Sequence, residues 1–138
     1  MSALHIAFFG HNVGDAAVRR RAIAFQRAGF EVTGFMPHRG TGSAPLWRHI
    51  ELGKTHDIAY IQRGIGIFSG SQKAMQHTKL LCRADVLYAR NLDMLALAQR
   101  VRRRLGLSIP LVYECLDIHQ RLSGPSMSAR LLRQLERH

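Results

Sequence analysis

The sequence has few cysteines and no long apolar run, and each shortage excludes a class of protein. Among 138 residues only Cys82 and Cys115 are cysteines, too few for a disulfide framework or a cysteine-rich metal cluster. No apolar run approaches the roughly 20 residues of a membrane-spanning helix. The N-terminus lacks the basic and apolar regions of a secretory signal. We therefore expect a single cytoplasmic domain.

Motifs for metals and organic cofactors are also missing. The eight histidines show no paired H-x-x-x-H spacing, which disfavours a metal site. The loop after the first predicted strand has the spacing G-x-x-x-G instead of the dinucleotide pattern G-x-G-x-x-G, and no phosphate-loop lysine follows it. The sequence therefore predicts no metal and no cofactor.

The charge is strongly unbalanced. The chain has 20 Lys+Arg against 9 Asp+Glu, a formal net charge of +11, and 46% of its residues are hydrophobic, too many for a disordered chain. Arginines cluster at 19–21 and 100–104, where solvated helix faces are the plainest explanation. Attraction to a polyanion is the alternative. Because aromatic residues are not interleaved with these clusters, we expect no nucleic-acid partner. Contact with an anionic membrane surface remains open.

Short apolar strands alternate with amphipathic helices. Strands are predicted at 4–9, 31–36, 85–89 and 111–113, with Pro37 ending the second. The segment 47–52 favours a strand, and 58–61 fits either a strand or part of a helix. Helices are predicted from an N-cap at Asp15 to Gly29, over 67–83, and from Asn91 or Asp93 to Gly106, followed by a last amphipathic segment. This alternation indicates an α/β fold, a Rossmann-like three-layer sandwich with a mainly parallel sheet of about five strands.

A glycine-containing loop follows the first predicted strand, where ligands of parallel sheets bind. It offers Gly10, His11, Asn12, Gly14 and Asp15. Small residues before a helix N-terminus allow backbone N–H groups to approach an anion. The spacing G-x-x-x-G is also that of an ordinary turn, so both interpretations stay open.

The loop after the strand at 85–89 carries Arg90, Asn91 and Asp93. Asn91 or Asp93 is expected to cap the next helix. Arg90 has no capping role, which favours contact with a ligand. The three side chains together are suited to hydroxyls and one charged group.

The loop after the last predicted strand carries Glu114, Asp117 and His119. Two carboxylates and an imidazole at a strand end are suited to binding sugar hydroxyls or to acid–base chemistry. Asp117 could also cap the following turn.

Three segments carry a family resemblance in their order along the chain. The first combines HIAFFG (5–10) with RRAIAFQRAGFEVTGF (20–35), the second is ADVLYARNLD (84–93) and the third is PLVYECLDIH (110–119). They are similar to the opening strand, helix and "GheV" strand, the "aDvvhahn" strand and the "pvvyt-HD" strand end of family-4-like glycosyltransferases. The sequence thus resembles the N-terminal domain of these enzymes, the first half of a GT-B architecture.

The resemblance implies a retaining transferase of polysaccharide biosynthesis that moves a sugar from a nucleotide-sugar to a glycan or lipid-linked acceptor. In such enzymes the N-terminal domain mainly receives the acceptor, and a C-terminal domain binds the donor. We therefore expect residues 1–138 to be the acceptor-side part of a two-domain enzyme, inactive alone. The resemblance places catalytic roles on Asp117, His119 and Glu114, although Leu116 stands where the family often has histidine.

Two other functional classes remain. A stand-alone flavodoxin-like binding or regulatory module would have the same fold without transfer activity. A basic nucleic-acid-binding domain would show an affinity that falls steeply with salt. The resemblance favours a cytoplasmic transferase, with the basic helices available for contact with the inner face of the plasma membrane.

Overall fold

The computed structural model describes residues 2–38, 44–54 and 60–115, and every structural statement below concerns these residues. The strands are β1 (His5–Phe9), β2 (Glu31–His38), β3 (Arg48–Lys54), β4 (Val86–Arg90) and β5 (Leu111–Glu114). The helices are α1 (Ala16–Arg27), α2 (Tyr60–Met75), α3 (Thr78–Cys82) and α4 (Leu92–Leu105). None of these helices combines the length and apolar character needed to cross a bilayer.

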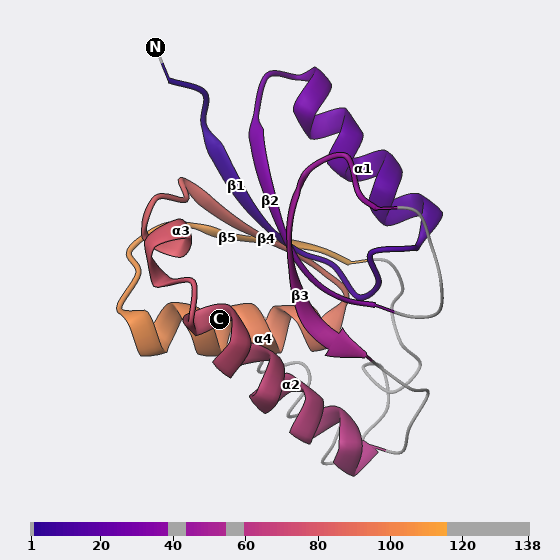
Figure 1. Ribbon diagram of the computed structural model, residues 1–138. Helices are drawn as coiled ribbons and strands as arrows, with labels where there is room; N and C mark the ends of the chain where they lie inside the picture. The colour runs from indigo at the N-terminus through magenta and orange to yellow at the C-terminus, as the bar shows by residue number, and fades with distance from the viewer. Residues whose placement is uncertain (1, 39–43, 55–59, 116–138) are drawn as a thin grey trace.

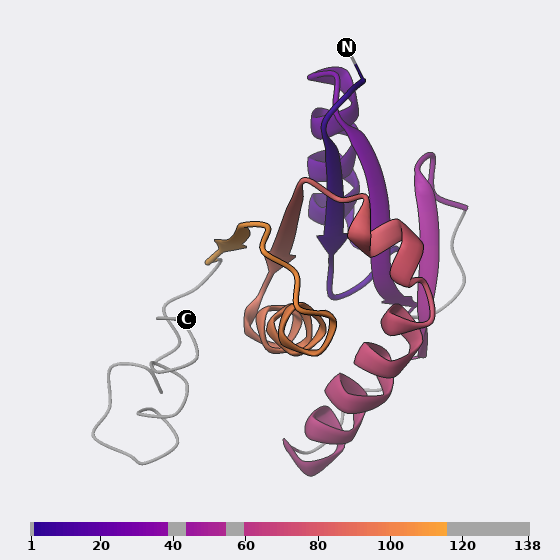
Figure 2. The same ribbon diagram turned by 90° about the vertical axis from the view of Figure 1, so that its left-hand side faces the viewer.

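All five strands form one parallel sheet in the order β3-β2-β1-β4-β5. Helix α1 covers one face, and α2, α3 and α4 lie on the other (Figures 1 and 2). Parallel strands joined through helices bury both faces of a sheet. The predicted Rossmann-like α/β sandwich is therefore confirmed.

Strand β1 is the centre of the core because all five of its residues are buried. Its side chains alternate between two apolar clusters. Phe8 packs with Val18 of α1 on one face, whereas Phe9 packs with Leu95 of α4 on the other. On the α1 face the rings of Phe8, Phe25 and Tyr88 make edge-to-face contacts with centroids 5.0–5.9 Å apart. This aromatic cluster joins α1 to β1 and β4.

Local hydrogen bonds explain where the helices begin and end. The carboxylate of Asp15 accepts from the N–H groups of Ala17 and Val18, both at 3.0 Å, which confirms the predicted N-cap of α1. Asn91 is the N-cap of α4 and accepts from the Met94 N–H at 2.9 Å. Gly106 ends α4 in the left-handed conformation, as the sequence predicts.

Two predicted boundaries are wrong. Strand β2 continues through Pro37 to His38, because its pairing with β3 shifts between Met36 and His38, an irregularity where the missing proline N–H is tolerated. The predicted helix over 67–83 is two helices, since α2 already begins at Tyr60 and ends at Met75. The hydroxyl of Thr78 donates to the Met75 carbonyl at 2.6 Å, a local bond that competes with a continuous helix.

Candidate functional site

The carboxyl ends of the parallel strands meet at one edge of the sheet. Strands β2 and β3 extend the sheet on one side of β1, whereas β4 and β5 extend it on the other, so the chain reverses its direction of winding between β1 and β4. Ligands of open parallel sheets bind outside the strand ends at such a switch point. Because Phe9 pairs with Ala89, the residues that follow them, Gly10 and Arg90, lie across the switch point from each other. The structure therefore brings the first two predicted loops together.

Gly10 allows the loop after β1 to pass close to its neighbours. A Cβ atom at Gly10 would lie 3.0 Å from the Met36 sulfur and 3.1 Å from a methyl group of Val18. A larger residue would therefore push the loop away from α1 and β2. This packing explains the first glycine without a ligand.

The rest of this loop is held by its own polar groups. Asn12 Oδ1 accepts from the Gly14 N–H at 3.0 Å, and His11 Nε2 lies 3.7 Å from Asp15 Oδ2. Burial alone would raise the pKa of Asp15, but the hydrogen bond from the Val18 N–H and the charge of His11 outweigh it and lower this pKa. Asp15 is therefore anionic at neutral pH, and the positive end of α1 already holds a carboxylate.

Arg90 is the most deeply buried cation of the site. It is the last residue of β4, and only 8% of its surface is exposed. Its Nε and Nη1 atoms are buried and have no hydrogen-bond partner among the described residues. Glu114 Oε2 lies 3.7 Å from Arg90 Nε, and the two groups form an ion pair without a hydrogen bond.

Glu114 closes the site on the side of β5. Its Oε1 accepts from Arg21 Nη2 at 2.8 Å, and its Oε2 accepts a short hydrogen bond from the Tyr88 hydroxyl. Partial burial would raise the pKa of Glu114, but the hydrogen bonds from Arg21 and Tyr88 prevail and lower it. Burial and the hydrogen bond to Glu114 raise the pKa of Tyr88. Glu114 is thus an ionised, fully engaged carboxylate, which suits positioning better than proton transfer.

Arg21 and Tyr88 are functional residues that the sequence did not predict. Arg21 belongs to a cluster expected on a solvated helix face, although it lies three positions after Val18 and four before Phe25, on the same face of α1. Tyr88 lies two residues before Arg90 in β4, so both side chains lie on the same face of the sheet. The periodicity of α1 could therefore have identified Arg21, and that of β4 could have identified Tyr88.

The remaining predicted residues divide into three groups. Asn91 caps α4 with its side-chain oxygen, so of the two predicted capping residues, Asn91 and Asp93, the first is confirmed. Asp93 lies in the first turn of α4, at the same edge. Asp117 and His119 lie outside the described residues.

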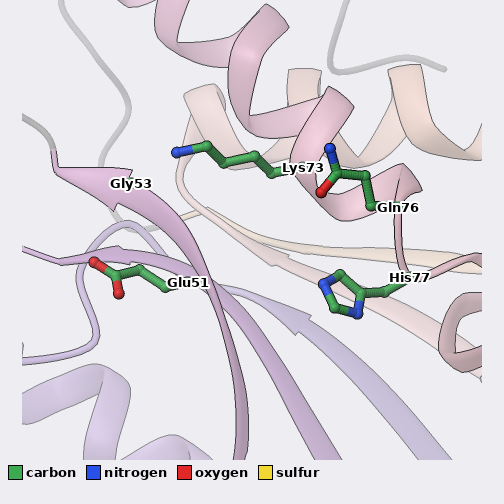
Figure 3. A pocket seen from close by; sticks show the side chains of 5 residues that line it. All are labelled: Glu51, Gly53, Lys73, Gln76 and His77. Carbon is green, nitrogen blue, oxygen red and sulfur yellow. The ribbon is translucent and has the colours of Figure 1, made fainter.

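A separate open hollow of about 450 Å³ lies beside the outer strand β3 (Figure 3). It is lined by Glu51 and Gly53 of β3, by Lys73 of α2, and by Gln76 and His77. Strands β2 and β1 separate β3 from the switch point. None of the predicted site residues contributes to this hollow, so it is distinct from the edge described above. Nowhere in the described ranges do three His, Cys, Asp or Glu side chains gather as metal ligands would.

The fold and its switch-point edge place the chain in the class of Rossmann-like α/β domains. Comparison with known proteins narrows this class. The chain is 37% identical to the succinoglycan biosynthesis protein ExoL of Rhizobium meliloti (strain 1021) over 144 aligned residues, which cover 96% of this chain and 34% of ExoL. No protein-family model matches the chain.

A solved structure shares the fold. The lipopolysaccharide outer core galactosyltransferase WaaB in its apo form matches with a TM-score of 0.53 and 14% sequence identity, covering 80% of this chain and 32% of WaaB. The chain thus spans about a third of both relatives. Together the matches confirm the resemblance drawn from the sequence. The chain is similar in sequence to part of ExoL and shares the fold of part of the galactosyltransferase WaaB.

Proposed function

We propose that this chain is the N-terminal, acceptor-side domain of a retaining glycosyltransferase. The complete enzyme would move a sugar from a nucleotide-sugar to a glycan or lipid-linked acceptor in polysaccharide biosynthesis. The main support is the meeting of the carboxyl ends of β1, β4 and β5 at one edge, in a chain similar to ExoL.

Each loop has a role in this proposal. Arg90 and Asp93 would orient the substrate at the switch point, while Asn91 fixes the start of α4 beside them. Gly10, His11, Asn12, Gly14 and Asp15 would form the wall on the β1 side. Glu114 would position Arg90, and catalytic contacts with the sugar would come from Asp117 and His119, which follow it in the sequence.

Transfer would require a second domain that closes over this edge. Closure excludes water and holds donor and acceptor in attack geometry. The second domain would bind the nucleotide-sugar and stabilise most of the charge on the leaving diphosphate. Residues 1–138 alone would then bind acceptor without completing transfer.

The test is sugar transfer by the complete protein encoded with this domain. We would incubate it with a panel of nucleotide-sugars and a lipid extract of the source cells, and measure nucleoside diphosphate release and labelled glycolipid. Arg90→Gln is expected to lower kcat/KM about tenfold or more, the loss that follows removal of a charge-assisted contact. Arg20→Gln, on the exposed surface of α1, is the matched control. Absence of donor-dependent product with every nucleotide-sugar would refute the proposal.

We also propose that the domain works in the cytoplasm and touches the inner face of the plasma membrane through α2. Ile65 and Phe68 of this helix are 63% and 52% exposed. The guanidinium of Arg100 lies 4.5 Å from the centre of the Phe68 ring, so a cation borders the apolar residues. Figure 2 shows the N-terminal half of α2 extending past the sheet. Apolar side chains beside a cation suit anionic lipid headgroups.

Co-sedimentation with phosphatidylglycerol-containing vesicles tests this contact. Binding is expected to rise with the anionic lipid fraction and to fall in the double variant Ile65→Ser, Phe68→Ser. Leu46→Ser changes a residue that is 78% exposed elsewhere and is expected to bind like the wild type. Binding that does not change with the fraction of anionic lipid would contradict the membrane proposal.

A further inference from the structure

Arg90 is a buried cation with unused donors. Arg90 is only 8% exposed, so its guanidinium gives up hydration, and protein or ligand acceptors normally replace the lost water. Its Nε and Nη1 atoms have no such acceptor in the described part of the chain. An unsatisfied buried donor is unfavourable, so the site is more stable once an acceptor binds.

Two carboxylates near Arg90 are engaged elsewhere. Glu114 accepts from Arg21 and Tyr88, and its Oε2 stays 3.7 Å from Arg90 Nε. Asp15 accepts from two N–H groups of α1. Because Arg21 balances Glu114 and the positive end of α1 partly balances Asp15, Arg90 retains close to one uncompensated positive charge.

The start of α4 adds to this charge. Asn91, which directly follows Arg90, caps the 14-residue helix with a neutral amide, so the positive end of its dipole is not cancelled by the cap. Asp93 in the first turn offsets part of this field. The combined charges of Arg90, Asp93 and the start of α4 favour a ligand group with a single negative charge over a doubly charged one.

We propose that Arg90 is the anchor of an anion site at the switch point that binds one singly charged oxyanion, either a carboxylate or a phosphodiester oxygen. The two sources share this chemistry, and a substrate of the proposed transferase could carry either, as a sugar acid or as a diphosphate-linked group. The site depends only on the folded domain. A domain that binds the anion without any transfer activity in the complete protein would refute the transferase proposal and leave this one intact.

The experiment is an NMR titration of the ¹⁵N-labelled chain, following the Arg90 Nε–H resonance and the amides of Asn91 and Leu92. The probes are dimethyl phosphate, acetate and the neutral methyl glucoside. Saturable shifts with one or both anions, and none with the glucoside, are expected. The stronger anion identifies the source as a phosphodiester or a carboxylate.

Four variants distinguish a specific site from general attraction of anions to a basic protein. Arg90→Gln is expected to weaken anion affinity about tenfold or more, and Arg20→Gln is expected to leave it unchanged. Glu114→Gln removes a negative charge next to Arg90 and is expected to strengthen binding several-fold, a gain that a purely structural role would not produce. Arg90→Lys keeps the charge if Arg90→Gln does not fold, and is expected to bind more weakly than the wild type.

Two results would overturn the proposal. The first is a set of shifts that are linear with concentration and equal in the Arg90 and Arg20 variants. The second is an Arg90 Nε–H resonance that does not shift with anions in the wild type but does shift with them in Asp117→Asn. This result would identify Asp117, and not a ligand, as the acceptor for Arg90.

Discussion

Asn91 has a backbone conformation that asparagine rarely adopts, and its replacement is a sharp test of the site. Its φ of 91° and ψ of 168° lie in a region occupied almost only by glycine. No other described residue except glycine has a positive φ. The strain lies next to Arg90 at the switch point, where strain is retained if it serves a ligand.

The expected effect of Asn91→Gly is the relief of backbone strain, which is opposed by the lost capping bond and by the larger entropy of the unfolded chain. The conformation costs about 1–3 kcal/mol. Asn91→Gly removes this strain, loses a few tenths of a kcal/mol of capping and adds about 0.4–1 kcal/mol of unfolded-chain entropy. We therefore expect Asn91→Gly to stabilise the domain by about 0.5–1.5 kcal/mol. Asn91→Ala keeps the strain and loses the cap, so it is expected to destabilise by about 1 kcal/mol.

Urea denaturation of the two variants measures the difference. A separation of about 2 kcal/mol in the free energy of unfolding is expected, with glycine above the wild type and alanine below it. Ordinary capping predicts that both substitutions destabilise, glycine by only a few tenths. If glycine is no more stable than asparagine, the strain at this position does not exist and its functional interpretation falls with it.

Two further predictions concern stability. Arg21 and Glu114, 2.8 Å apart with Arg21 45% exposed, are expected to couple by about 1 kcal/mol in a double-mutant cycle with glutamine at each position. The pKa of Glu114 lies below its ordinary 4.5, so this stability is present above pH 4.5 and disappears as the pH falls through the lowered value. The cycle repeated near pH 2 should therefore give no coupling. Equal coupling at both pH values would contradict the ion pair. Gly34→Ala places a Cβ 2.6 Å from Trp47 Nε1 and is expected to cost about 1–3 kcal/mol. Gly64→Ala, in α2 with open space around it, should instead gain about 0.5–1 kcal/mol, and thermal unfolding of the pair would show whether the contact with the indole is real.

The sequence predicts those elements whose signals are local. The apolar run before Gly10 and the carboxylate at Asp15 mark the end of β1 and the start of α1, and both marks act within a few residues. The parallel sheet then follows from the alternation of strands and helices, because few topologies satisfy short crossovers. The break between α2 and α3 was not predicted because the apolar pattern of this segment is helical throughout, and the hydroxyl-to-carbonyl bond of Thr78 that accompanies the break leaves no mark in that pattern.

The electrostatics of the site could not be predicted in the same way. Arg21 and Glu114 are 93 positions apart in the sequence, and their pairing depends on the packing of α1 against the sheet to which β5 belongs. Without that pairing, Glu114 looks like a free catalytic carboxylate. With it, Glu114 is an ionised partner of Arg21, and Arg90 is left as the unsatisfied group. The position of the candidate site can therefore be predicted from the strand ends, whereas the chemical role of each of its residues depends on tertiary contacts.

The caps of α1 and α4 divide the switch point into two chemically different sides. Both helices begin at the carboxyl edge, but α1 is capped by the carboxylate of Asp15 and α4 by the amide of Asn91. A ligand anion placed over α1 would face the carboxylate of its cap, whereas one placed over α4 would face Arg90 and an uncharged cap, with Asp93 in the first turn offsetting only part of that positive field. The loop from Gly10 to Asp15 is thus suited to hydroxyl groups, and the end of β4 to the charged group. A substrate with both kinds of group would therefore bind in a single orientation across the edge.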